Sequence, residues 1–197
     1  MRKLIEQIYR LRWGPLPDRK KLGLVRLFDT IAETGFHNQF WMNGGLLLGC
    51  IRTGEPLLWD TDVDFSFWET DTPLFLEAKQ ALRKNGFNEG RARRNEDGSQ
   101  TKWAFKHLGL KFEFFAMKDL GDRIRWYSHA HKGNLEMVNE CPMHGLSEIE
   151  LYGRKWLKPD DHVTYLASVY GNWKEPDPSY CYWRDSTAIV ARYTRQR

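Results

Sequence analysis

The chain has 197 residues, of which 41% are hydrophobic and 14% aromatic, a composition typical of a folded globular protein rather than a disordered one. Its 30 basic and 26 acidic residues give a formal net charge of +4, a near balance that argues against a nucleic-acid-coating surface. The longest uncharged apolar stretch, residues 44–51, is far shorter than the ~20 residues of a membrane span, and no signal-peptide pattern opens the chain, so we expect a cytoplasmic protein without a transmembrane segment.

The first part of the chain is strongly basic. Residues 1–26 carry eight basic and two acidic side chains, which gives this region a net charge of +6. We predict a helix over residues 3–12 and a second helix that begins at Asp18 as its N-cap and ends at Gly35. A basic helix is either a solvated face or a surface that attracts anionic lipid or a phosphate-rich substrate. For the basic helix within residues 1–17 both roles stay open, including peripheral contact with the inner face of a membrane.

A glycine-rich turn follows the first predicted strand. The apolar strand over residues 39–42 leads into Asn43, Gly44 and Gly45 and then into a short helix. Two glycines let a ligand approach the backbone closely, and the start of a helix offers free N–H groups to an anion. Arg52 follows one to two turns later, where it can add a bidentate contact to a phosphate. The pattern predicts a phosphate cradle, with an ordinary tight turn as the alternative.

Three aspartates alternate along the next predicted strand, residues 57–67. Side chains on a strand alternate between two faces, so Asp60, Asp62 and Asp64 share one face, while Trp59 and the later apolar residues point inward. Adjacent like charges repel one another, and a divalent cation offsets that repulsion. Carboxylate oxygens without Cys or His favour Mg²⁺ or Mn²⁺. We therefore predict a metal site, with a solvated acidic edge of a sheet as the alternative.

The rest of the chain mixes helices and strands irregularly. This order predicts an α+β fold rather than a doubly wound α/β fold. We expect the tail over residues 172–183, rich in Pro, Tyr and Trp, to wrap over the surface. The later predicted elements are a helix from Asp71 or Thr72 that ends before Gly86, strands on either side of a polar turn at residues 95–100, a strand at residues 111–117, a hairpin at residues 148–157 that turns at Tyr152 and Gly153, and a last helix from Pro159 to Gly171.

Two stretches of sequence resemble a known family. The sequence FWMNGGLLLGCIR at residues 40–52, followed by LWDTDVD at residues 58–64, resembles the signature of the LicD/fukutin family of the nucleotidyltransferase-fold superfamily. Residues 112–115 are similar to the family's later strand that carries a third acid. The chain departs from the family pattern at Leu46, where a Thr is frequent, and at Glu113, where Asp is more frequent.

The resemblance implies a fold and an activity. The fold is a nucleotidyltransferase-like mixed β-sheet with flanking helices, with a catalytic domain over residues 18–176 and a tail over residues 177–197 packed on it. Relatives move phosphocholine, phosphoribitol or a similar phospho-alcohol from a CDP-linked donor, so we expect such a donor and a glycan or glycolipid acceptor. Two alternatives stay open: a nucleotidyltransferase that passes a nucleoside monophosphate to a small acceptor, and a non-catalytic module that binds a sugar or a nucleotide.

The resemblance also implies roles for the site residues. Asp62 and Asp64 would hold Mg²⁺ or Mn²⁺ on the donor's diphosphate, which the glycine turn and Arg52 would cradle. Glu113 would take the proton of the acceptor hydroxyl or complete a second metal site. Asp60 is either a further metal ligand or an acceptor that fixes Arg52 or a water.

Three of the polar residues allow two interpretations each. Glu113 is a catalytic group or a strand charge that pairs with Lys111 or Lys102. His129 and His131 lie two positions apart, so they either face one site from a strand or belong to a surface loop. The sequence alone does not choose between these interpretations.

Overall fold

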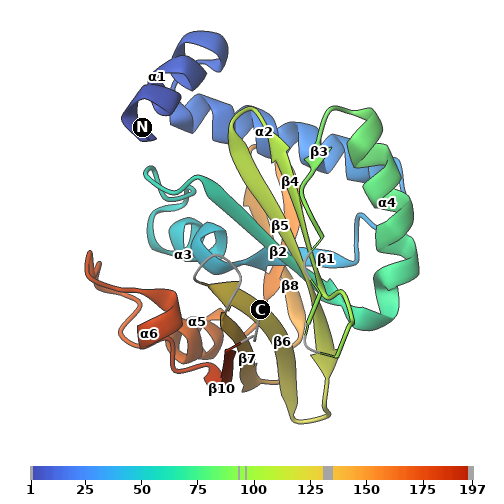
Figure 1. Cartoon of the computed structure of the whole chain (residues 1–197), viewed down its shortest axis with the longest axis vertical. Helices are drawn as coiled ribbons and strands as arrows, with labels where there is room; N and C mark the ends of the chain where they lie inside the picture. The colour runs from blue at the N-terminus through green and yellow to red at the C-terminus, as the bar shows by residue number, and fades with distance from the viewer. Residues whose placement is uncertain (1, 93, 96, 131–134, 195–197) are drawn as a thin grey trace.

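The computed structural model describes residues 2–92, 94–95, 97–130 and 135–194 (Figure 1). Within these residues, helices flank a mixed ten-stranded sheet, which confirms the predicted α+β class. The helices are α1 (Arg2–Trp13), α2 (Leu16–Ala32), α3 (Gly44–Thr53), α4 (Thr72–Lys84), α5 (His162–Tyr170) and α6 (Tyr182–Asp185), with a 3-10 turn η1 (Glu69–Asp71) before α4. The strands are β1 (Phe40–Asn43), β2 (Asp62–Trp68), β3 (Asn88–Glu89), β4 (Lys102–His107), β5 (Leu110–Asp119), β6 (Arg123–Ala130), β7 (Leu135–Pro142), β8 (Leu146–Leu151), β9 (Arg154–Pro159) and β10 (Ile189–Thr194).

The second helix differs from its prediction at both ends. It begins at Leu16 rather than Asp18, because Pro17 fits the first turn of a helix, where its missing N–H has no intrahelical partner to lose. Asp18 lies inside that turn instead of capping it. The helix ends at Ala32, before the predicted Gly35. Across the described residues, we find no helix with the length and apolar character needed to cross a membrane.

Strand β2 lies inside the sheet, between β1 and β5. It runs antiparallel to β1 and parallel to β5, and the register sets Asp62 opposite Lys111 and Asp64 opposite Glu113. The strand order is β10-β7-β6-β5-β2-β1-β9-β8, with β4 paired to β5 and to β3. Asp62 and Asp64 therefore lie on a central strand, so the alternative of a solvated sheet edge is wrong.

The acidic strand is shorter than predicted. It begins at Asp62, whereas the alternation of the sequence predicted a strand from residue 57. The Asp60 carboxylate accepts a hydrogen bond from the Asp62 N–H (3.0 Å), and the Lys20 ammonium donates one to the Leu57 carbonyl. Side chains therefore bond to backbone groups that, in a longer strand, would bond to a neighbouring strand. Trp59 is 68% exposed, and the prediction that it packs inward is wrong.

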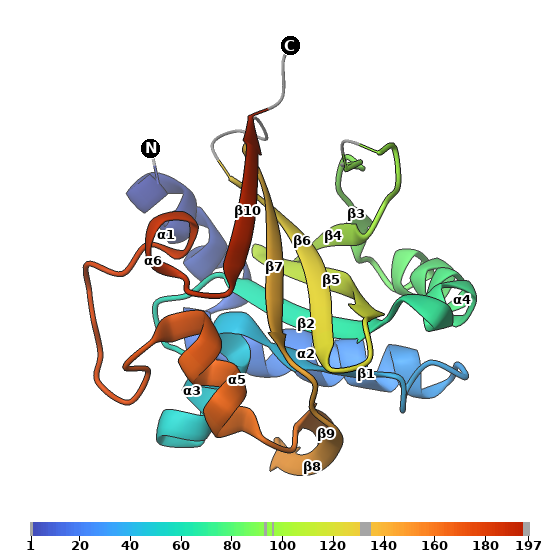
Figure 2. The same cartoon turned by 90° about the horizontal axis from the view of Figure 1, so that it is seen from below.

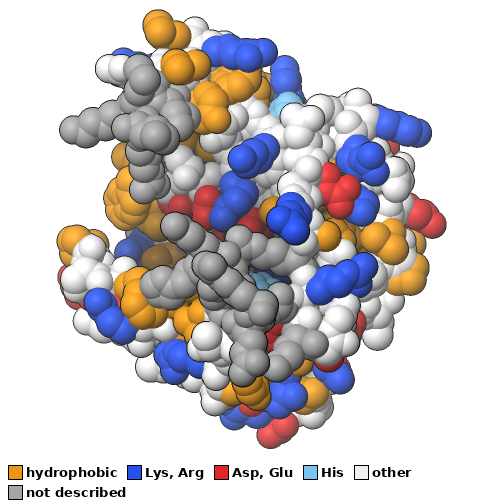
Figure 3. Space-filling view, viewed as in Figure 1, with side chains coloured by type: hydrophobic (Ala, Val, Ile, Leu, Met, Phe, Trp, Pro, Cys, Tyr) orange, Lys and Arg blue, Asp and Glu red, His pale blue; other side chains and the backbone are white. Residues whose placement is uncertain are grey.

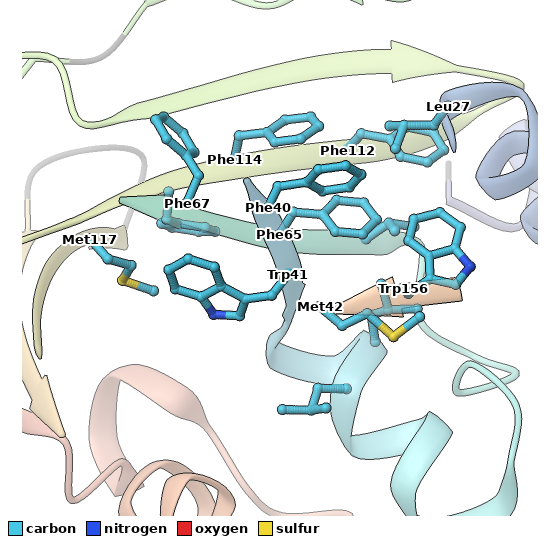
Figure 4. Packing of buried hydrophobic residues seen from close by; sticks show 14 of the residues in the cluster. Leu27, Phe40, Trp41, Met42, Phe65, Phe67, Phe112, Phe114, Met117 and Trp156 are labelled. Atoms are coloured by element: carbon cyan, nitrogen blue, oxygen red, sulfur yellow. The ribbon is translucent and has the colours of Figure 1, made fainter. Parts of the chain in front are cut away.

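Aromatic rings cover the face of β2 that is opposite to the acids (Figure 4). The fully buried Phe65 ring lies 5.3 Å from the Phe40 ring and 5.7 Å from Trp156, measured between centroids. The Phe67 ring stacks on Phe75 of α4 at 4.7 Å. Helix α4 therefore packs on this face, with α2 beside it (Figure 1). Because burial of these rings fixes the orientation of β2, its acidic side chains point to the other side of the sheet.

The second half of the chain contains strands that the sequence analysis did not predict. Strands β6 and β7 form an antiparallel pair, and β10 adds to β7. In Figure 2 these three strands cross the direction of β2 steeply, with α5 and α6 beside them. Helix α6 also corrects the prediction that α5 is the last helix. The predicted hairpin is present as β8 and β9, with its turn at Tyr152 and Gly153.

Candidate functional site

A cleft of about 1130 Å³ opens on the acidic side of β2. Residues of β2, β4, β5 and the start of α3 line it on one side, and residues of β6, α5 and the segment after α5 line it on the other. The site residues predicted from the sequence all contribute to its lining: Gly44, Gly45, Arg52, Asp60, Asp62, Asp64 and Glu113. The fold thus gathers in one cleft residues that are far apart in the sequence.

Lysine side chains neutralise two of the acids. The Lys111 ammonium lies 2.8 Å from Asp62 Oδ2 and 3.2 Å from Glu113 Oε2, and Lys102 Nζ lies 2.9 Å from Glu113 Oε1. Burial by itself would lower the pKa of Lys111, but the Glu113 and Asp62 carboxylates outweigh it and raise that pKa. Both of the ion pairs considered for Glu113 therefore exist, and they hold it inside the cleft.

Asp64 forms no ion pair with a described residue. Its Oδ1 atom is buried and has no hydrogen-bond partner in the described part of the chain. Burial raises the pKa of this carboxyl well above its usual value, and repulsion from Glu113, Asp62 and Asp60 adds to the shift, although Lys102 opposes it. A buried carboxylate with a free oxygen and an unfavourable charge is a group that a bound cation would stabilise.

Asp60 belongs to the same cleft although it precedes the strand. Burial raises the pKa of its carboxyl, while the hydrogen bond from the Asp62 N–H and the charge of Lys20 oppose the shift. Lys20 is buried beneath this loop, and burial lowers its pKa. The cleft therefore holds four acids, Asp60, Asp62, Asp64 and Glu113, whose charges Lys20, Lys102 and Lys111 balance only in part.

The glycine turn lies directly against these acids. Gly44 has a φ of +55°, and a Cβ atom there would come 2.5 Å from Asp64 Oδ2. A Cβ on Gly45 would meet the carboxylate of Asp60 in the same way. Asn43 caps the helix, since its side chain accepts a hydrogen bond from the Gly44 N–H (2.6 Å). The two glycines are thus required by the close approach of the carboxylates, which the sequence analysis did not foresee.

Asn43 connects the turn to both sides of the cleft. Its amide nitrogen donates to Ser66 Oγ (2.7 Å), and its carbonyl oxygen also accepts a hydrogen bond from the Tyr165 hydroxyl of α5. Both Asn43 and Tyr165 are buried. The side chain therefore holds β2, α3 and α5 together, and its position directly before two glycines at a helix start is the signal that could have revealed it.

We expect Gly44→Ala to destabilise the protein more than Gly98→Ala, and to remove activity. Gly98 also has a positive φ, +83°, but no heavy atom lies within 4 Å of its would-be Cβ. Both variants acquire the backbone strain of a left-handed residue, about 1–2 kcal/mol, and only Gly44→Ala also displaces Asp64. Urea unfolding of the two variants measures the difference. Equal losses of unfolding free energy in Gly44→Ala and Gly98→Ala would show that a Cβ on Gly44 does not clash with the Asp64 carboxylate.

Arg52 lines the cleft but its guanidinium is already engaged. Its Nε donates to the carbonyl oxygen of Trp173, and its Nη2 donates to the carbonyl oxygen of Glu175 (3.2 Å). These contacts fasten the segment that follows α5 to helix α3. In this arrangement Arg52 positions one wall of the cleft with two of its N–H donors, and a phosphate contact would use its remaining N–H groups.

A row of basic side chains stands beside the acids. Lys102 and Lys106 alternate with Ala104 on β4, and all three line the cleft together with Lys111 and Arg91. Figure 3 shows basic side chains next to acidic ones at the hollow of this face. The alternation of the two lysines on β4 is visible in the sequence and could have identified this row.

One of the two predicted histidines also reaches the cleft. His129 on β6 lines it, and its Nε2 atom lies 3.5 Å from Glu136 Oε2 on the neighbouring strand. His131 lies outside the described residues. The interpretation of His129 as a surface-loop residue is therefore wrong, because it lies on a strand with its side chain buried.

The described residues of the cleft offer carboxylates to a magnesium ion but no complete set of protein ligands. Among the residues that the structure describes, no three His, Cys, Asp or Glu side chains form a ready group of metal ligands. Mg²⁺ usually takes one or two protein carboxylates and completes its shell with water and phosphate oxygens. The free oxygen of Asp64 and the neighbouring Asp62 meet that smaller requirement.

Comparison with solved structures finds several similar folds. A candidate nucleotidyltransferase from Thermotoga maritima is 18% identical, with 73% of this chain and 79% of that chain covered and a TM-score of 0.44. The crystal structure of ANT(2″)-Ia in complex with adenylyl-2″-tobramycin is 13% identical, with 77% of this chain and 78% of that chain covered and a TM-score of 0.46. The solution structure of the antibiotic-resistance factor ANT(2″)-Ia is 12% identical, with 81% of this chain and 78% of that chain covered and a TM-score of 0.48.

The family assignment rests on the sequence itself. No curated protein matches the chain. The family model described as LicD/FKTN/FKRP, nucleotidyltransferase domain, matches residues 37–161, which is more than half of the chain and includes the glycine turn, the aspartates and Glu113. This match confirms the resemblance seen in the sequence. The chain belongs to the LicD/FKTN/FKRP family of nucleotidyltransferase domains, and this membership supports a transferase.

Proposed function

We propose that this protein is a metal-dependent phosphotransferase that moves a phospho-alcohol from a CDP-linked donor to a hydroxyl of a glycan. Phosphocholine and phosphoribitol are the transferred groups we expect. The observation that supports this proposal best is the juxtaposition in one cleft of a buried, unpartnered Asp64 oxygen and a row of lysines. Such a site offers one region to a cation and another to the phosphates that the cation accompanies.

Asp62 and Asp64 would hold Mg²⁺ or Mn²⁺. When bound, the ion neutralises negative charge on the donor's diphosphate. Lys102 and Lys106 face the cleft from β4, where they attract the same phosphates. The lack of a side chain on Gly44 and Gly45 leaves the room that the carboxylates of Asp64 and Asp60 occupy, which keeps both acids in the cleft.

The transfer itself is a displacement at phosphorus. The acceptor hydroxyl oxygen attacks the phosphorus that carries the alcohol, the bond from that phosphorus to the CMP oxygen breaks, and CMP leaves with the electron pair. Glu113 takes the proton of the hydroxyl. Because Lys102 and Lys111 hold both of its oxygens, this step follows the movement of at least one lysine toward the phosphates.

A second candidate function is the transfer of a nucleoside monophosphate to a small acceptor. The family model is described as a nucleotidyltransferase domain, and the same cleft could serve this reaction. The products distinguish the two reactions. A phosphotransferase releases CMP from a CDP-linked donor, whereas a nucleotidyltransferase releases diphosphate from CTP or ATP.

A thermal-shift screen tests the proposal first. We expect CDP-choline, CDP-ribitol or CDP-glycerol with Mg²⁺ to raise Tm by about 5–10 °C at ~100-fold over Kd, because a ligand that binds only the folded state stabilises it. CTP and ATP should shift Tm less. Chromatography of the products with a glycan acceptor then tests for CMP. Stabilisation by CTP with release of diphosphate would support the second candidate, and no shift with any nucleotide would contradict both.

A further inference from the structure

Four exposed apolar side chains lie on one side of the molecule. Ile8 and Leu11 on α1 are 53% and 89% exposed, and Leu58 and Trp59 in the α3–β2 connection are 62% and 68% exposed. Figures 1 and 2 both place α1 and this connection on the same side of the molecule. We call these four residues the apolar rim. Trp59 also lines the cleft, so the rim continues into the site.

Helix α1 is held with its apolar residues outward. On its inner side Glu6 pairs with the buried Arg19 of α2, and the Tyr9 ring fits against Gly109 and packs on Trp13. These contacts fix the rotation of the helix. Its other face therefore points to solvent. That face presents large apolar side chains, whose removal from water would lower the free energy.

Basic residues flank the exposed apolar side chains of α1. Arg10 and Arg12 alternate with Leu11 on the exposed part of α1, and Lys21 follows on the exposed part of α2. Arg19 and Lys20 of the same basic region are buried, so the exposed positive charge here comes from Arg10, Arg12 and Lys21. A helix with exposed apolar residues flanked by arginines is typical of segments that lie at the boundary of a membrane with anionic lipids.

We propose that the apolar rim docks on the surface of an anionic lipid bilayer. Ile8, Leu11 and Trp59 would enter the headgroup region, and the arginines of α1 would pair with lipid phosphates. Because Trp59 borders the cleft, docking brings the site to the plane in which a lipid-anchored hydroxyl lies. This consequence for the acceptor rests on the proposed function, whereas the docking itself does not.

Sedimentation of the full chain with vesicles tests the docking. We expect binding to vesicles of phosphatidylcholine mixed with phosphatidylglycerol, little binding to phosphatidylcholine alone, and loss of binding at ~1 M salt, where charges are screened over about 3 Å. The double variant Ile8→Ser with Leu11→Ser should bind at least ~10-fold more weakly. Leu76→Ser is the matched control, since Leu76 is 42% exposed on α4, and it should bind like the unchanged protein.

A second variant separates lost docking from lost folding. Arg10→Gln with Arg12→Gln keeps the apolar residues and should also reduce binding to anionic vesicles by ~10-fold or more, with Tm unchanged. Equal binding by all variants would overturn the proposal. So would analytical ultracentrifugation in which the rim variants abolish a dimer, because the occupant would then be a second copy. Donor binding measured without vesicles is independent, so failure of the proposed function is a separate result.

Discussion

Asp64→Asn is expected to abolish metal-dependent activity while making the metal-free protein more stable. Asn keeps the size of Asp and removes its charge, so the close fit of the side chain against Gly44 is preserved. Loss of a metal ligand should reduce turnover by about 10³-fold or more, because a bound ion contributes several kcal/mol and each 1.36 kcal/mol is tenfold in rate. The variant should also lose the nucleotide-dependent thermal shift.

The gain in stability should depend on pH. Burial raises the pKa of the Asp64 carboxyl, so the folded protein holds this proton more tightly than the unfolded chain. A raised pKa contributes stability that is complete below the unfolded value of about 3.9 and is lost as the pH rises through the folded value. The metal-free parent protein therefore loses stability toward neutral pH through this group, and Asp64→Asn escapes that loss. The difference in unfolding free energy should be largest near neutral pH and small near about pH 4.

Asp97→Asn provides the opposite case. Asp97 is exposed, and hydrogen bonds from Ser99 lower the pKa of its carboxyl, so its contribution to stability is present above the unfolded pKa and is lost as the pH falls. This variant should retain activity, and any loss of stability should appear at neutral pH.

Urea unfolding of Asp64→Asn and Asp97→Asn in a chelator, across the pH range, measures both predictions. If Asp64→Asn were less stable than the parent protein at neutral pH, Asp64 would be a stabilising charge and its assignment to a metal would lose its basis.

The sequence predicted the acidic side of the site because that part depends on local pattern. Asp62 and Asp64 share a face through the alternation of one strand, and Gly44 marks the start of the next helix by residue type alone. The family signature lies in the same region, and the match over residues 37–161 agrees with it. What the pattern could not show is that the glycines make room for carboxylates, since that contact joins two separate elements.

The opposite wall of the cleft could not be predicted in the same way. Strand β10 pairs with β7, and the pairing depends on contacts between distant parts of the chain. His129 and Tyr165 reach the cleft only because β6 and α5 are folded over β2. Arg52 is the clearest example, because its spacing after the glycine turn predicted a phosphate contact, but no local pattern could show that two of its N–H donors bond to the carbonyls of Trp173 and Glu175.

Lys111→Met is expected to tighten metal binding in the absence of donor. The Lys111 ammonium bridges Asp62 and Glu113, so it occupies the side of the acidic group that a metal ion would share. Two unit charges ~4 Å apart interact by about 4 kcal/mol at an effective dielectric of 20. Since the side chain is 36% exposed, solvent screens part of this, but about 1.4 kcal/mol is already tenfold in affinity. We therefore expect Mn²⁺ to bind the variant at least ~10-fold more tightly, as measured by calorimetry.

The CDP-linked donor should bind Lys111→Met more weakly than the parent protein, because Lys111 is then missing from the basic row that attracts the donor's phosphates. Lys118→Met is the matched control, since Lys118 lies on the exposed end of the same strand, and Lys111→Arg keeps the charge; both should bind Mn²⁺ like the parent protein. If Lys111→Met left the Mn²⁺ affinity unchanged, the lysine would be a fixed part of the site. If it tightened Mn²⁺ binding and weakened donor binding, the ammonium would be a cation that holds the carboxylates until the metal and the donor's phosphates replace it.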